Sequence, residues 1–474
     1  MTLGQAKALL PTGNPSVRDF SRIGLMVLAV GAALAGCSTT RPPVNQPASP
    51  EHGVAEYRLQ NLAPRPGNSD NLVVILTFSG GGARAAAFAY GVLNELKSTS
   101  VHRKGMATSL FDEVDVVAGV SGGSITAAYL AAFGDEIFLN FEPEFLKSDF
   151  QGALLSRTRS LGNALQLTSP WFGRGHLLAE QLDETLFRGI TYGDLAIRHT
   201  RPFLLITATD LTHGTGFEFS QDQFDILCSR FDKFPLAVAV AASSAVPLVL
   251  SPITVRNYAK TCAAPLASLD RATDNLTTRP RVAATASTYL DSDRRPYIHL
   301  VDGGLSDNLA VRWIIDNMAD YGDIAKPIER NGFRDVGKLV IINVNAEQGL
   351  NLSLDRSDKT PSISEVAEAV SSASLSRRSR ETRVILASRT TQWREQLRTA
   401  SRSGSRALSS SIELYVIDVN LQAHPDPKVR ERLQAIPTAL SLPHTEVDLL
   451  ITAARTILRD SDEFKRLLRA LSVQ

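Results

Sequence analysis

Gly119-Val120-Ser121-Gly122-Gly123 is the stretch of sequence that decides the fold. A strand-like apolar run, 114–118, leads into it, and a helical pattern, 125–133, follows it. A Gly-x-Ser-x-Gly between a strand and a helix is typical of a nucleophile elbow, a turn whose tightness requires glycines and pushes the serine hydroxyl clear of the backbone. The first N–H groups of the helix place partial positive charge where an oxyanion would form. The sequence therefore predicts a nucleophile at Ser121, although small-residue turns of this kind also occur without catalysis.

Strand and helix patterns alternate along the rest of the chain. Helical patterns cover 85–97 and 125–133. The predicted strands are short apolar runs at 72–78, 114–118, 203–208, 298–301, 339–344 and 414–417. This alternation predicts an α/β layered fold with a mostly parallel central sheet. The polar segments 262–296 and 347–362 are expected to be loops or insertions.

A second glycine run, Ser79-Gly80-Gly81-Gly82-Ala83-Arg84, follows the first predicted strand and opens a helix. Consecutive glycines at such a turn leave backbone N–H groups uncovered, and these can hold an anion. One candidate is a pyrophosphate, since Gly80-x-Gly82-x-x-Ala85 fits a loose dinucleotide pattern, but that pattern needs an acidic residue after a second strand, where this chain has the serine turn. The other is the oxyanion of a tetrahedral intermediate, held by the amides of Gly81 and Gly82. A plain glycine turn is the third possibility.

A nucleophilic serine needs a base, and none of the eight histidines stands in a motif that marks it as one. His299 lies inside a strand pattern and is expected to be a packed core residue. Asp302-Gly303-Gly304 directly follows the strand 298–301, at the sheet edge where open α/β folds place their chemistry. A simple Asp-Gly turn is the alternative.

The N-terminus has the order of a secretion signal. Arg18 and Arg22 precede an apolar run, 23–33, that is too short to span a bilayer stably. Leu34-Ala35-Gly36-Cys37 resembles the bacterial lipobox, after which Cys37 would carry acyl chains and anchor the protein to a membrane. By analogy with lipoprotein sorting in Gram-negative bacteria, Ser38 after this cysteine favours the outer membrane of the cell envelope.

These features divide the chain into three parts. Residues 1–36 are expected to be a lipoprotein signal peptide, and residues 37–56 the lipidated cysteine with a proline-rich, flexible tether. Residues 57–474 would form the folded domain, with a core at about 70–345 and a C-terminal extension at about 346–474.

Charge and composition limit the partners. Loss of residues 1–36 changes the formal charge from +1 to −1, which argues against a nucleic-acid binder. No Cys/His spacing suggests a metal site, and no cofactor is expected. Cys228 and Cys262 could pair in an oxidising compartment or stay free. Nine arginines between Arg377 and Arg406, with Trp393 among them, predict either a solvated surface helix or one that lies on anionic lipid.

Taken together, the motifs resemble those of the patatin-like phospholipases. Gly-Gly-Gly-x-Arg at 80–84, Gly-x-Ser-x-Gly at 119–123 and Asp-Gly-Gly at 302–304 come in the order found in that family. The block 242–247 is similar to its Ala-Ser-x-Ala-x-Pro motif, and is expected to shape the pocket without chemistry of its own. The likeness spans about residues 70–345, with a weaker trace at 436–438.

The resemblance implies a three-layer patatin-like fold with helices on both faces of the sheet, and a lipid acyl hydrolase with a Ser–Asp dyad. Ser121 would be the nucleophile, Asp302 its base, and Gly80, Gly81 and Gly82 the oxyanion hole. Arg84 would support the glycine loop or contact a phosphate head group. The implied substrates are phospholipids or other acyl-ester lipids, cleaved as by a phospholipase A or lysophospholipase.

Two other classes of function stay open at the level of sequence. One is a histidine-using α/β-hydrolase, either an esterase or a protease. The other is a non-catalytic envelope scaffold that keeps the same fold.

Overall fold

The computed structural model describes residues 43–48, 56–69, 71–103, 106–262, 287–321, 324–349, 354–356 and 358–472. The expected signal peptide and Cys37 lie outside these ranges. Within them, no helix is both long enough and apolar enough to cross a membrane.

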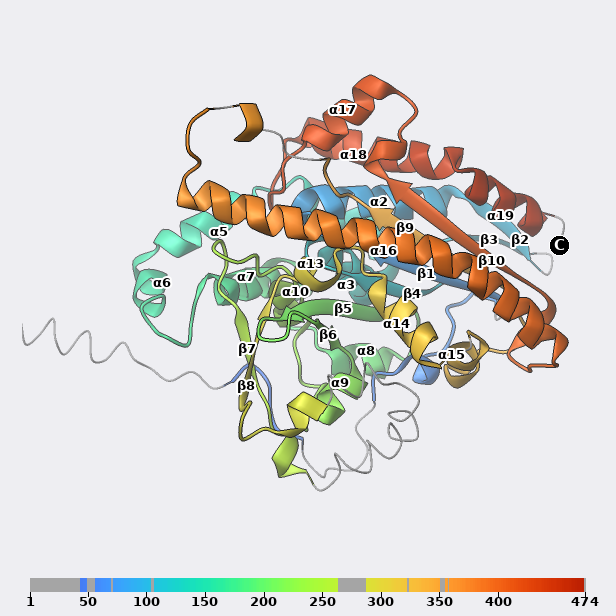
Figure 1. Ribbon diagram of the computed structural model, residues 1–474, viewed down its shortest axis with the longest axis horizontal. Coiled ribbons are helices and arrows are strands. Elements are labelled where there is room, and N and C mark those ends of the chain that lie inside the picture. The colour runs from blue at the N-terminus through green and yellow to red at the C-terminus, as the bar shows by residue number, and fades with distance from the viewer. Residues whose placement is uncertain are drawn as a thin grey trace, which may run out of the picture.

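One mixed β-sheet runs through the middle of the domain (Figure 1). Its strand order is β10-β9-β1-β4-β5-β8-β7, and β6 pairs with β5 off this path. The strands are β1 (Leu72–Phe78), β4 (Val114–Gly119), β5 (Phe203–Asp210), β6 (Gly216–Phe219), β7 (Ile253–Arg256), β8 (Tyr297–Val301), β9 (Val336–Asn345) and β10 (Leu408–Asn420). The first five strands in the order, from β10 to β5, are parallel, and β6, β7 and β8 pair antiparallel. The mostly parallel sheet predicted from the sequence is confirmed.

Helices cover both faces of this sheet. Along β1, Leu72, Val74, Leu76 and Phe78 point into one core and Val73 and Ile75 into the other, because alternate side chains of a strand face opposite ways. The helices that pack on the first face include α2 (Gly82–Ser98), α3 (Gly122–Phe133), α7 (Arg174–Leu182), α10 (Leu236–Ser243) and α18 (His444–Asp460). On the second face lie α14 (Arg312–Tyr321), α15 (Ala325–Arg330) and α16 (Ile363–Arg402). The three-layer architecture is therefore present.

The remaining elements are short or peripheral. A two-stranded hairpin consists of β2 (Ser100–Arg103) and β3 (Met106–Ser109). The other helices are α4 (Ile137–Phe141), α5 (Phe150–Arg159), α6 (Leu161–Gln166), α8 (Tyr192–Arg198), α9 (Gln221–Ile226), α13 (Gly304–Asp307), α17 (Pro427–Ala435) and α19 (Asp462–Ser472). Single helical turns are η1 (Leu59–Asn61), η2 (Gly134–Glu136), η3 (Glu142–Leu146), η4 (Asp183–Phe187), η5 (Ala259–Thr261), η6 (Leu354–Arg356) and η7 (Leu421–Ala423).

The chain after residue 345 belongs to the same sheet and core. Strand β10 pairs with β9 along most of its length, and α18 packs against α2. Helix α16 runs across the front of the molecule in Figure 1 and packs on α13, the short helix that follows Asp302. The C-terminal third therefore completes the sheet and covers part of the region around that aspartate.

One expectation about a single side chain is wrong, and one of the two alternatives for the basic segment 377–406 loses the support of an aromatic side chain. His299 lies in β8, as predicted, but its side chain is exposed and hydrogen-bonds Thr254 at 2.8 Å, because this end of the sheet is covered on one face only. Trp393 on α16 is 2 % exposed and packs in the second core, so it cannot be the aromatic of a membrane-lying basic helix. The pairing that the sequence left open is present: Cys228 and Cys262 form a disulfide.

Candidate active site

Ser121 stands at a strained turn between β4 and α3. Strand β4 ends at Gly119 and α3 begins at Gly122, so two residues make the whole connection. The backbone of Ser121 has φ 51° and ψ −127°, a conformation that non-glycine residues seldom adopt. Such strain persists where the surrounding structure enforces it, and it clusters at functional sites. The predicted elbow geometry is present.

The glycines around Ser121 are required by contact between two backbones. A Cβ on Gly122 would overlap the carbonyl of Gly82, and one on Gly123 would overlap the carbonyl of Ser79. A Cβ on Gly80 would lie 3.3 Å from the Cβ of Ser121. The glycine loop after β1 and the elbow after β4 therefore touch, which is possible because β1 and β4 are parallel neighbours.

Asp302 meets the hydroxyl of Ser121. The Ser121 Oγ donates a hydrogen bond of 2.8 Å to Asp302 Oδ2, and the Gly304 N–H donates one of 2.8 Å to Oδ1. Both Ser121 and Asp302 are buried, at 8 % and 7 % exposure. Burial raises the pKa of the Asp302 carboxyl to about 6, and the hydrogen bonds from Ser121 and Gly304 oppose that rise. The result is a carboxylate that is ionised at neutral pH yet basic enough to accept a proton transiently.

The block 242–247 holds this pair in place. The Ser243 Oγ accepts the Ser121 N–H at 2.9 Å and donates to the Thr207 carbonyl at 2.7 Å. The Ala245 carbonyl accepts the Asp302 N–H at 2.9 Å. The sequence predicted only that this block shapes the pocket, and did not reveal that Ser243 links Ser121 to β5.

The three glycine amides differ in what they can do. The Gly80 N–H donates to the carbonyl of Asn308 at 3.0 Å, so it is already used, and its prediction as an oxyanion donor is wrong for this conformation. Within the described part of the chain, the N–H groups of Gly81 and Gly82 are not hydrogen-bonded, and both residues have positive φ, 139° and 59°. The Gly122 N–H, directly after the nucleophile, has no acceptor among the same residues and was missed as a candidate donor.

Arg84 supports the glycine loop from inside. Its side chain is 3 % exposed, Nε donates to the Ala346 carbonyl at 2.9 Å, and Nη1 donates to the Ile436 carbonyl at 2.8 Å. Burial lowers the pKa of this guanidinium to about 10, and the nearby charge of Glu347 opposes the change. Of the two predicted roles, the geometry favours loop support, because the buried guanidinium is not presented to a head group.

Two further segments contact the glycine loop after β1. The sequence weakly indicated one of them and did not indicate the other. The Ala439 carbonyl accepts the Ala83 N–H at 2.7 Å, next to the Ile436 contact with Arg84, so the weak family trace at 436–438 has a structural role. Asn308 places its side-chain Oδ1 where a Cβ on Gly80 or Gly304 would meet it. No motif in the sequence marked Asn308.

Other candidate groups lie elsewhere. Among the side chains that the structure describes, no imidazole is bonded to the Ser121 hydroxyl; His299 bonds Thr254 and His444 bonds the Lys147 carbonyl. No cluster of three or more His, Cys, Asp or Glu in the described ranges is arranged to hold a metal ion.

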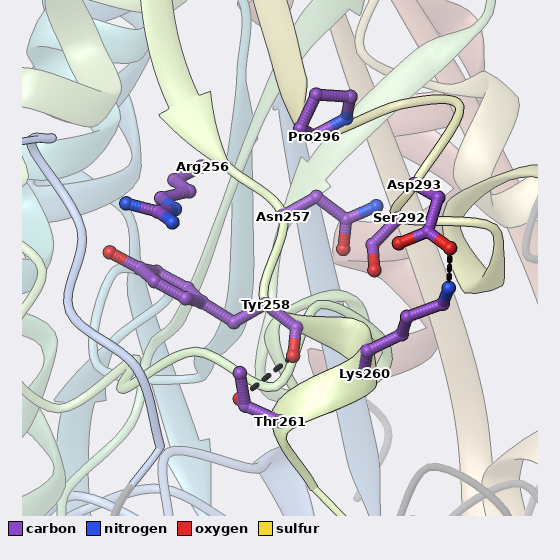
Figure 2. Close-up of a pocket in the computed structure, with 8 residues that line it drawn as sticks. All are labelled: Arg256, Asn257, Tyr258, Lys260, Thr261, Ser292, Asp293 and Pro296. Carbon is purple, nitrogen blue, oxygen red and sulfur yellow. Dashed lines mark hydrogen bonds and ion pairs between the residues drawn. The ribbon is translucent and has the colours of Figure 1, made fainter.

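A hollow of about 370 Å³ lies beside β7 and does not include the Ser121–Asp302 pair. Figure 2 shows Lys260 paired with Asp293 across it, and the Thr261 hydroxyl bonded to the Tyr258 carbonyl. The lining residues are Arg256, Asn257, Tyr258, Lys260, Thr261, Ser292, Asp293 and Pro296. We assign it no part in chemistry at Ser121.

The structure thus combines a three-layer α/β fold with a buried serine–aspartate pair, beside glycine N–H groups that have no hydrogen-bond acceptor among the described residues. The patatin-like phospholipase family profile matches residues 76–312, half of the chain, and the protein therefore belongs to that family. The matched range contains the glycine loop, the elbow and Asp302.

Three solved structures are similar to the chain. Human GIVD cytosolic phospholipase A2 is 14% identical over 85% of this chain and 60% of its own, with a TM-score of 0.42. VipD from Legionella pneumophila is 14% identical over 86% of this chain and 72% of its own, with a TM-score of 0.26. The ExoU–SpcU complex of Pseudomonas aeruginosa gives 18% identity over 44% and 45%, with a TM-score of 0.16. The chain thus spans about 60% of the length of the human protein. No curated protein matches it.

Proposed function

We propose that the protein is a serine acylhydrolase that cleaves fatty acyl esters of phospholipids, as a phospholipase A or lysophospholipase does. Family membership supports lipid acyl hydrolysis. The observation that carries the proposal is the 2.8 Å hydrogen bond from the Ser121 hydroxyl to the Asp302 carboxylate.

The first half-reaction follows from that contact. Asp302 accepts the Ser121 proton while Oγ attacks the ester carbonyl, and the carbonyl oxygen becomes an oxyanion. The N–H groups of Gly81 and Gly82, which have no acceptor in the described ranges, lie on the loop that touches Ser121, so they are the donors proposed to stabilise the oxyanion. When the intermediate collapses, Asp302 returns the proton to the leaving alcohol and the acyl group stays on Ser121.

The second half-reaction uses the same groups with water. Asp302 takes a proton from a water molecule that attacks the acyl ester, and the oxyanion forms again on the same side. Collapse breaks the bond to Oγ, Ser121 regains its proton from Asp302, and the fatty acid leaves. A carboxyl with a pKa of about 6 suits both transfers, since it is ionised at neutral pH and not strongly acidic.

The proposal is tested by fatty acid release from mixed phospholipids. Ser121→Ala removes the nucleophile and should lower the rate by about 10⁴-fold or more, and Asp302→Asn by about 10²–10⁴-fold. Asp307→Asn is a matched control, because burial also raises the pKa of Asp307 to about 6 and its carboxylate bonds the N–H groups of Leu309 and Arg312, not Ser121. Full activity in Ser121→Ala or Asp302→Asn would remove the dyad. No release by the wild type would favour a non-catalytic scaffold.

We also propose that acyl chains on Cys37 hold the protein to the cell envelope, at the outer membrane in a Gram-negative cell. The support is the order of charge, apolar run and small residues before that cysteine. Cys37→Ser should release the protein from the membrane fraction at high salt. Continued tight association of that variant with the membrane fraction would contradict the anchor.

A further inference from the structure

Two surface loops near the Ser121–Asp302 pair expose large apolar side chains. Trp171 is 47% exposed, Leu248 69%, Val249 59% and Val246 37%. Single exposed apolar residues are normal on protein surfaces, but a group of them is characteristic of a binding surface.

The two loops form one continuous piece of surface. Arg174 Nη2 donates to the Leu248 carbonyl at 2.8 Å, and the Gly175 N–H donates to Ser251 Oγ at 3.0 Å. A Cβ on Gly173 would overlap the side chain of Ser251. The turn that carries Trp171 and the loop 246–251 are therefore packed together.

Leu248 is held in an unfavourable backbone conformation. Its φ is 71°, in the left-handed region that costs a branched residue energy, although its side chain is mostly exposed. The Arg174 bond and the turn bonds from the N–H groups of Val249 and Leu250 to the Val246 carbonyl, at 3.2 and 2.9 Å, hold it there. The cost of this backbone conformation is therefore not offset by burial of the leucine side chain itself.

The surface is directly connected to the catalytic pair. Val246 follows Ala245, whose carbonyl accepts the Asp302 N–H at 2.9 Å, and Ser243 in the same block bonds the Ser121 N–H at 2.9 Å. A ligand bound at this surface would therefore sit against the segment that positions both catalytic side chains.

The charge around the surface is positive. The sequence contains no Asp or Glu from residue 150 to 179 and none from 234 to 262. Arg157 is neutralised by ion pairs with Glu184 and Glu180. The positive charge here therefore comes from Arg159 and Arg174. Helix α6, just before Trp171, adds Leu161 and Leu165 at 87% and 56% exposure. Apolar side chains flanked by arginines, with a tryptophan at the boundary, are suited to a bilayer surface with anionic head groups.

We propose that Trp171, Arg174, Val246, Leu248 and Val249 form a docking surface for an anionic phospholipid bilayer. This inference rests on the proposed function, because docking there would present the bilayer to Ser121. It is separate from an acyl anchor on Cys37, since it orients the domain on the lipid and does not tether it.

The test measures vesicle binding without turnover or acyl chains. Full-length protein carrying Ser121→Ala and Cys37→Ser is mixed with phosphatidylglycerol or phosphatidylcholine vesicles and floated. We expect tighter binding to phosphatidylglycerol, weakened by salt. Adding Leu248→Ser with Val249→Ser should reduce the bound fraction about tenfold. Leu139→Ser, a control at a leucine 75% exposed on α4, should not change it.

Tryptophan fluorescence gives a second readout. Of the three tryptophans, Trp393 is buried and Trp313 partly buried, so a blue shift on binding reports mainly Trp171 and should vanish in Trp171→Phe. Equal binding to both vesicle types, no effect of the Leu248 and Val249 changes, or a shift that survives Trp171→Phe would overturn the docking surface. Hydrolysis of a water-soluble short-chain ester by protein with Ser121 intact answers separately whether the proposed function holds.

Discussion

The Ser121–Asp302 site, the proposed catalytic edge, and the proposed docking surface are neighbours with opposite structural requirements. At the catalytic edge, Gly122 lies so close to Gly82 that not even a methyl group fits between them. At the docking surface, Leu248 and Val249 expose more than half of their side chains. If both proposals hold, the chemistry at Ser121 depends on backbone contacts that leave no room for a side chain, whereas attachment to lipid depends on exposed apolar area that many side chains can supply.

The sharpest expected effect is at the backbone contact itself. Gly122→Ala places a Cβ on the Gly82 carbonyl, so either the elbow or the glycine loop must move. Ester hydrolysis should fall by about 10³-fold or more, because small displacements at a reacting centre are costly. Unfolding free energy should fall by about 1–3 kcal/mol, as for other overpacked sites. Both are measured with a soluble ester and by urea denaturation.

Gly162→Ala is the matched control for that substitution. Gly162 lies within helix α6, and a Cβ there meets nothing within 4 Å. Alanine favours the helix, so stability should rise by about 0.5–1 kcal/mol with activity unchanged. Comparable damage from both alanines would mean that the backbone contact is not what fixes the catalytic edge.

The next effect concerns the support behind the glycine loop. Arg84→Met keeps the volume but leaves the Ala346 and Ile436 carbonyls without their donor, which should cost roughly 3 kcal/mol of stability. Activity should fall as well, because the loop that carries the Gly81 and Gly82 N–H groups is no longer held by the Arg84 hydrogen bonds. Arg377→Met is the comparison, since that arginine is exposed and, among the described residues, its ion-pair partner is Glu381 on the same helix. If Arg84→Met behaves like Arg377→Met, the buried guanidinium has no supporting role.

Local motifs could be predicted from the sequence, whereas long-range contacts such as those of Arg84 could not. The turns at Ser121 and at the glycine loop were predictable because each motif is local and its geometry needs those residue types. Asp302 was assigned as the base only through the resemblance to patatin-like phospholipases, since an Asp-Gly pair by itself is equally an ordinary turn. The contacts from Asn308 to Gly80, and from Ala439 and Ile436 to the loop, were not, because they join segments hundreds of residues apart. The exposed side of His299 was missed because strand periodicity does not reveal which face of a sheet is covered.

The activity of the wild type should depend on pH through Asp302. The carboxyl must be ionised to accept the Ser121 proton, so kcat/KM for a soluble ester should rise with pH, about tenfold per unit below a midpoint near 6, and level off above it. Asp307→Asn should leave this midpoint in place, because Asp307 does not contact Ser121. A midpoint near 4 would mean that burial does not control the base.

The titration of Asp302 also predicts that the stability of the fold falls with rising pH, whereas activity rises. Because the folded-state pKa of Asp302 is raised above its unfolded value, the folded protein holds this proton more tightly, and stability present at low pH is lost as pH rises through about 6. Asp302→Asn should therefore be more stable than the wild type by about 3 kcal/mol at pH 8, with the gap closing below pH 4. Urea midpoints of both proteins across that range check the sign. If Asp302→Asn were less stable than the wild type at pH 8, the ionised Asp302 carboxylate would not destabilise the folded state.

The smallest expected effect separates stability from attachment at the docking surface. Leu248→Gly relieves the left-handed backbone, where φ is 71°, and should raise stability by up to about 1 kcal/mol, since glycine adopts that conformation freely. The same change removes an exposed apolar side chain, so binding to phosphatidylglycerol vesicles should weaken by about threefold to tenfold. Leu248→Asn is a second way to remove the apolar side chain without adding backbone strain, because asparagine also tolerates the left-handed region. It should therefore weaken vesicle binding as Leu248→Gly does. If Leu248→Gly binds vesicles as well as the wild type, Leu248 is not part of a docking surface. If Leu248→Gly is more stable than the wild type but binds vesicles more weakly, the strained backbone is kept for lipid binding.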